Sequence, residues 1–76
     1  MVYKLSCAFR AKYLRRTENT TGLCEAAVGR SADELNTEFA TRSLHWTFDS
    51  YEQAEAARYR LSTTKTRFLY LSIAHP

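Results

Sequence analysis

The sequence predicts a small α+β domain with helices on one face of a three-stranded, or four-stranded, sheet. Three observations support this prediction. Residues 2–10 and 44–48 alternate apolar and polar side chains with the period of a strand. Residues 51–61 repeat apolar side chains at helical spacing, and residues 67–73 are rich in β-forming residue types. With one helix expected between the first two strands, the order of elements is β-α-β-α-β.

Length and composition limit the class of protein. A chain of 76 residues builds one small core, so residues 1–76 are expected to form a single domain. The formal charge of +3 permits an acidic partner but is smaller than that of strongly basic nucleic-acid-binding tails. We see neither a membrane-spanning apolar run nor a signal-peptide pattern. We therefore expect no membrane partner and a cytoplasmic location, which is the host cytoplasm if a phage encodes the chain.

The first expected strand covers residues 2–10. Its alternation places Lys4 and Arg10 on the face opposite the main apolar set. If the chain continues as an extended arm, Lys12 joins that basic face; the alternative is a helical turn over residues 10–16. The composition of residues 17–22 is typical of a turn or loop.

The middle of the chain has a less regular pattern. Ser31 and Glu34 have the spacing of a capping box, which predicts a helix over residues 32–39. Residues 23–28 fit either a shorter helix, interrupted by Gly29, or an edge strand hairpinned to the first strand. Both alternatives stay open.

A β-α-β unit is predicted over residues 44–73. Ser50 is expected to cap a helix that begins at about Tyr51, with Gln53 completing a capping box. Connections of this kind place the two flanking strands parallel to each other. The first strand of the chain should pair antiparallel with one or both of them. The result is a split β-α-β arrangement, like a reduced ferredoxin-like sheet.

Strict alternation on the last strand predicts an open, basic sheet face. Leu69, Leu71 and Ile73 should face the helices, so Phe68 and Tyr70 should lie on the uncovered side. The alternative is that another segment of the chain covers these two rings. The residues expected on the open face are Lys4, Arg10, Lys12, Thr41, Ser43, His45, Thr47, Phe68 and Tyr70.

The sequence predicts no catalytic, metal or cofactor site. Cys7 and Cys24 match no metal-ligand spacing, and His45 and His75 lie far from both in the sequence. We expect two reduced, packed thiols, with a disulfide between them as the alternative. An enzyme is not expected, because a domain this small has little room for a pocket of about 300 Å³ or more.

The expected function is binding without catalysis. Aromatic rings with cations at their rim are typical of protein interfaces, so we expect a protein that modulates or inhibits a larger protein or nucleoprotein assembly by steric occlusion. Small inhibitors of phages and mobile elements, anti-CRISPR proteins among them, act in this general way, although no residue here distinguishes that class. The alternative is a module that stacks single-stranded RNA or DNA on the same face. Edge-strand pairing, including a homodimer, is a further route. The expected contact residues are Lys4, Arg10, Lys12, His45, Arg67, Phe68 and Tyr70.

Overall fold

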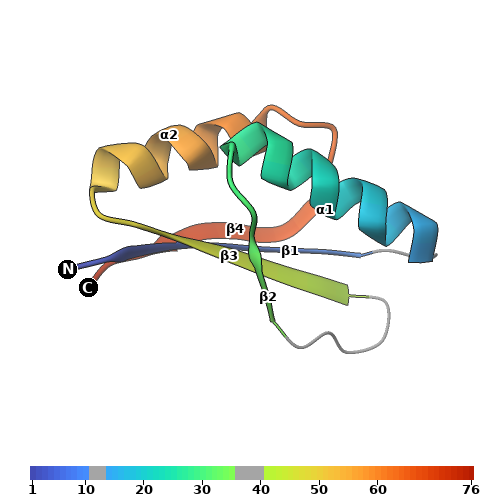
Figure 1. Cartoon of the computed structure of the whole chain (residues 1–76), viewed down its shortest axis with the longest axis horizontal. Helices are drawn as coiled ribbons and strands as arrows, with labels where there is room; N and C mark the ends of the chain where they lie inside the picture. The colour runs from blue at the N-terminus through green and yellow to red at the C-terminus, as the bar shows by residue number, and fades with distance from the viewer. Residues whose placement is uncertain (11–13, 36–40) are drawn as a thin grey trace.

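The computed structural model describes residues 1–10, 14–35 and 41–76. Their elements are β1 (Tyr3–Arg10), α1 (Leu14–Val28), β2 (Asp33–Leu35), β3 (Thr41–Phe48), α2 (Tyr51–Ser62) and β4 (Phe68–Ala74). The strands form one antiparallel sheet in the order β2-β3-β1-β4. Both helices lie on one face of this sheet (Figure 1). The predicted α+β fold is confirmed with four strands, and the finer ferredoxin-like description stays a prediction.

The N-terminal strand β1 is central in the sheet. It pairs antiparallel with β3 on one side and with β4 on the other, as the sequence predicted. β3 and β4 therefore run parallel to each other without touching, and α2 connects them across the helix-bearing face (Figure 1). The core lies between sheet and helices and consists of Leu5, Cys7, Phe9, Cys24, Val28, Leu44, Trp46, Phe48, Ala54, Ala57 and Leu61.

Helix α2 begins where the sequence predicted. The Ser50 side chain accepts a hydrogen bond of 3.2 Å from the Gln53 N–H, which satisfies one free donor of the first turn. Ala54, Ala57 and Leu61 are buried along one stripe. Because two of the three are alanines, the helix axis can approach the sheet closely.

Helix α1 corrects two expectations. Residues 17–22, predicted to be a loop, lie inside α1. Arg15 and Arg16 are also helical, so the expected extended arm after β1 does not include them. The threonines and Gly22 are poor helix formers, but Cys24 and Val28 are buried against the sheet, and tertiary packing provides most of a protein helix's stability. Residues 23–28, for which a helix and an edge strand were both open, are helical.

The end of α1 explains why the predicted helix over residues 32–39 is wrong. Gly29 has φ of +85°, and the N–H groups of Gly29 and Arg30 both donate to the Glu25 carbonyl oxygen, at 2.8 and 3.2 Å. Gly29 therefore terminates α1 rather than interrupting it. The Glu25 carboxylate then accepts the Ala32 N–H at 2.7 Å, which draws the chain back to the sheet as β2. The last part of that predicted helix, residues 36–39, is outside the described residues.

A bulge in β4 corrects the predicted alternation. Tyr70 pairs with Ala8 and Phe68 with Phe9, so Leu69 is an extra residue without a partner on β1. Leu71 faces the core as predicted, but so does Phe68, whereas Leu69 is 54% exposed. The expectations for Phe68 and Leu69 are therefore wrong, because one inserted residue exchanges the two faces of a strand.

Candidate functional site: the open face of the sheet

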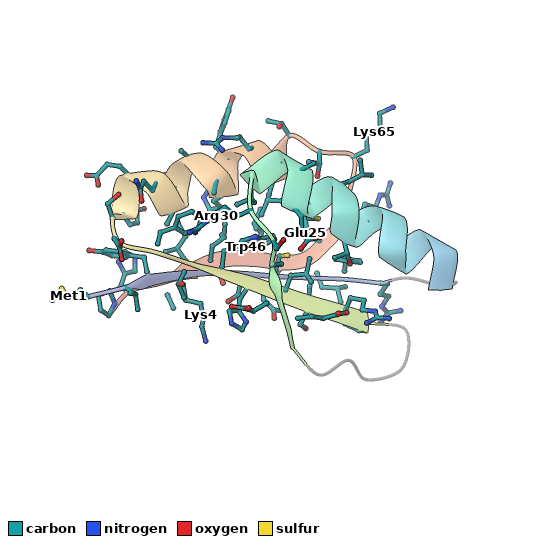
Figure 2. The ribbon with its side chains drawn as sticks, viewed as in Figure 1. Met1, Lys4, Glu25, Arg30, Trp46 and Lys65 are labelled. Carbon is teal, nitrogen blue, oxygen red and sulfur yellow. The ribbon has the colours of Figure 1, made fainter. Side chains whose placement is uncertain are left out.

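The open sheet face is the surface opposite the helices. On β1, Lys4 and Arg10 alternate with the buried Leu5, Cys7 and Phe9. Figure 2 shows the Lys4 side chain pointing away from both helices. The same alternation on β3 places residues 43, 45 and 47 on this face, because residues 44, 46 and 48 are buried.

The cross-strand register arranges this face in rows. Lys4 lies between Thr47 and Ala74, Ser6 between His45 and Ser72, and Ala8 between Ser43 and Tyr70; Arg10 pairs with Thr41. At a rise of about 3.4 Å per residue, the two β1 cations are separated by about 20 Å. The single ring of Tyr70 lies between their rows.

Tyr70 forms the apolar part of the open face. Its side chain is 46% exposed, and Ala8, opposite it in the register, is only 2% exposed. The Tyr70 ring therefore lies beside a residue that water hardly reaches. An aromatic ring in such a place can stack on a partner without ordering a long, flexible side chain.

An acid that the sequence reading missed lies at the β2 side of this face. Asp33 pairs with His45 in the register, and its Oδ2 is 3.6 Å from His45 Nε2. The imidazole side chain is 15% exposed, and its buried Nδ1 finds no hydrogen-bond partner among the residues described. The two groups form an ion pair only when His45 is protonated. Asp33 was missed because residues 32–39 were predicted to be helical.

The structure brings together four of the seven predicted contact residues. Lys4, Arg10, His45 and Tyr70 share the open face. Phe68 does not, because the bulge turns it toward the core. Arg67 is exposed immediately before β4, and Lys12 is outside the described residues.

Grooves lie on the helix-bearing side of the part of the chain that the structure describes, and two of them are defined by the residues that line them. One, of about 420 Å³, lies between the end of α1 and α2; the other, of about 500 Å³, lies beside the segment that follows α2. Both volumes exceed the value of about 300 Å³ for which so small a domain was expected to have little room. In the first groove, the Arg30 guanidinium lies 4.2 Å from the centre of the Phe48 ring and donates to the Thr47 carbonyl oxygen. Arg60 donates to the Val28 carbonyl oxygen at 3.4 Å. Both arginines thus bind the protein's own backbone. Among the described residues that line the two grooves there is no histidine or cysteine.

The two cysteines are free and fully buried. Burial raises the pKa of the Cys7 thiol to about 12 and that of the Cys24 thiol to about 11. Both thiols are therefore protonated at neutral pH, whereas a nucleophile or a metal ligand would have to be a thiolate. Across the described ranges no group of three or more His, Cys, Asp and Glu side chains could hold a metal ion.

We predict that these thiols make stability fall at alkaline pH. In the unfolded chain they ionise near pH 9, while in the fold they stay protonated to about pH 11–12. The contribution of the two thiols to the free energy of unfolding is complete below pH 9. It is lost as the pH rises above 9, and at pH 10 the loss is about 1 kcal/mol per thiol. The measurement is the thermal midpoint against pH. A Cys7→Ala, Cys24→Ala double variant should show a shallower decline between pH 8 and 10, and equal slopes would contradict the prediction.

Comparison of the chain with models of known protein families, with curated proteins and with solved structures finds no match in any of the three. Within the part of the chain that the structure describes, no helix is both long and apolar enough to cross a membrane. The function therefore has to follow from the surface of this chain.

Proposed function

We propose that this protein is a non-enzymatic binding protein that lays its open sheet face on a larger protein or nucleoprotein partner and modulates or inhibits it by occlusion. The observation that supports this proposal is the exposed Tyr70 ring between the rows of Lys4 and Arg10, on the face that neither helix covers. A cytoplasmic partner fits the proposal, and so does a phage inhibitor acting in the host cytoplasm.

The chemistry of the face suits a protein partner. A central aromatic ring with a polar, partly charged rim is the usual anatomy of a docking surface. The hydroxyl side chains of Ser43, in the row of Tyr70, and Ser72, in the next row, can form hydrogen bonds beside the ring, and that of Thr47 can do so in the row of Lys4. Because the core holds the strands from behind, little backbone entropy would be lost on binding.

The charge of the face favours an acidic patch on the partner. Lys4 and Arg10 are exposed on β1, while the exposed acid of this face, Asp33, lies two strands away and next to His45. A partner acid over β1 would meet two cations, which increases the rate of encounter at low salt.

Single-stranded nucleic acid is the second candidate, and one observation favours it. Tyr70 could stack a base while Lys4 and Arg10 meet phosphates on either side. With Phe68 turned to the core, however, one ring is available for stacking rather than the two expected from the sequence. Stacking energy is gained per base, so we place protein binding first.

The test is a paired set of variants. Lys4→Glu with Tyr70→Ala removes the centre of the open face and one rim cation. Lys65→Glu with Tyr59→Ala makes the same chemical changes at exposed positions away from this face; Tyr59 is 65% exposed on α2, and Lys65 projects on the helix side (Figure 2). Pull-downs from a host lysate should lose the partner with the first variant and keep it with the second.

A binding titration separates the two candidates. Labelled single-stranded RNA and DNA are titrated at several salt concentrations. A nucleic-acid module would show log K falling linearly with log salt, with a smaller slope in the Lys4→Glu, Tyr70→Ala variant. If that variant folds and keeps every interaction of the unmodified protein, the open face is not the binding surface.

A further inference from the structure

The two edges of the sheet differ in how they are protected from pairing with another chain. β2 has three residues, and two of them are the acids Asp33 and Glu34; Glu34 also forms an ion pair with Arg42. β4 has seven residues, FLYLSIA, with no charged residue and no proline. Short strands and charged side chains are the usual protection of an edge, and β4 has neither.

The straight part of β4 is well defined. Beyond the bulge at Leu69, residues 70–74 pair with β1 in unbroken register, from Ala8 opposite Tyr70 to Lys4 opposite Ala74. In the described sheet β1 lies on one side of this segment and no strand lies on the other. Alternate backbone N–H and C=O groups of the segment therefore point outward, and Ser72 is its midpoint.

We propose that β4 is a homodimer interface: residues 70–74 pair antiparallel with the same residues of a second copy, about a two-fold axis at Ser72. Two four-stranded sheets would then join into one. The two β4 edges would present identical rows of backbone N–H and C=O groups that can pair with each other, as a two-fold interface requires. This inference does not depend on the proposed function.

Side-chain pairing across such an axis is favourable. Leu71 would lie opposite Ile73 of the second copy on the core side, and Ser72 opposite its own equivalent on the open side. Leu69 exposes 54% of its surface beside this edge, and exposed apolar surface of that kind is often covered at an interface.

Charge favours the antiparallel arrangement of two copies over the parallel one. Lys65 and Arg67 are exposed at the N-terminal end of β4. Parallel pairing would place these cations side by side in the two copies. Antiparallel pairing about Ser72 puts Arg67 five residues from the axis in each copy, so the two Arg67 side chains would be roughly 30 Å apart at 3.4 Å per residue. This is more than two Debye lengths in physiological salt.

The dimer would extend the candidate site. The two open faces would become continuous across the joint, so that each dimer presents two copies of Lys4, Tyr70 and Arg10 on one surface. A partner with a repeated acidic feature would then bind with avidity rather than through one face.

The test uses charge at the axis. Sedimentation equilibrium and light scattering, over concentrations from about 1 μM to 1 mM, should show the unmodified protein approaching twice its 8.8 kDa chain mass. Ser72→Lys and Ser72→Glu should each be monomeric over most of that range, because like charges then face each other across the axis. An equimolar mixture of the two variants should dimerise again, and native mass spectrometry should identify the species as the mixed dimer.

The matched control is Ser6→Lys. Ser6 is next to Ser72 in the register but lies on β1, one strand in from the edge, so this variant should keep the dimer. Circular dichroism should show the same fold in all four proteins. The proposal is overturned if the unmodified protein is monomeric at about 1 mM, if both Ser72 variants dimerise like it, or if their mixture stays monomeric.

Discussion

Trp46→Ala is expected to lower the free energy of unfolding by about 3–5 kcal/mol, the usual range for deleting a buried aromatic ring. Trp46 is 2% exposed in the centre of the core. Its Nε1–H also donates to the Arg30 carbonyl oxygen at 3.1 Å, which ties the segment after α1 to β3. A core this small rarely provides more than about 3–5 kcal/mol of net stability. Much of the variant should therefore be unfolded at 25 °C.

Urea unfolding followed by circular dichroism measures this loss, because Trp46 is the only tryptophan and its fluorescence disappears with it. Trp46→Phe serves as the control. It keeps an aromatic ring in the core and leaves the Arg30 carbonyl without its donor, so the expected loss is about 1–3 kcal/mol. If Trp46→Ala cost less than about 1 kcal/mol, Trp46 would not be the core residue described here.

Phe68→Ala is expected to cost about 2 kcal/mol, whereas Leu69→Ala and Tyr70→Ala should each cost less than about 1 kcal/mol. Phe68 packs against the core but is not fully buried, which places its loss below that of a buried ring. Leu69 and Tyr70 are about half exposed. Simple alternation without the bulge predicts the reverse order for Phe68 and Leu69.

The same urea titrations measure these three variants, with Tyr70→Ala as the matched aromatic truncation one position beyond the bulge. A larger loss for Leu69→Ala than for Phe68→Ala would mean that β4 runs through without the extra residue. The order of the two losses, rather than either magnitude alone, tests the register.

The β-α-β unit could be predicted from the sequence because several independent signals agree there. Ser50 gives the start of α2, the alanine stripe gives its buried side, and regular alternation gives the buried side of β3. In β1 the same alternation placed Lys4 and Arg10 on the open face. In a regular strand, successive side chains point to opposite faces of the sheet, so the position of a residue in the alternation predicts its face.

Three features could not be predicted, each for a physical reason. Helix α1 contains threonines and a glycine that locally favour a loop, and only burial of Cys24 and Val28 against the sheet makes it helical. Strand β2 resembles a helix start, because Ser31 and Glu34 have capping-box spacing, but its pairing with β3 prevails. The bulge at Leu69 leaves no local signal, since a run of β-forming residues reads the same in either register. The site residues that were wrong or missed, Phe68 and Asp33, follow from the last two features.

The position of β1 also affects when this protein can fold. Of the four described strands, β1 is synthesised before the others. Its neighbours β3 and β4 follow much later in the sequence, and Lys4 finally pairs with Ala74. Until those strands have been translated, the apolar row of Leu5, Cys7 and Phe9 has no sheet to join. Contacts so distant in sequence slow folding and leave nascent chains open to aggregation. Folding must therefore wait until nearly all of the described chain has left the ribosome.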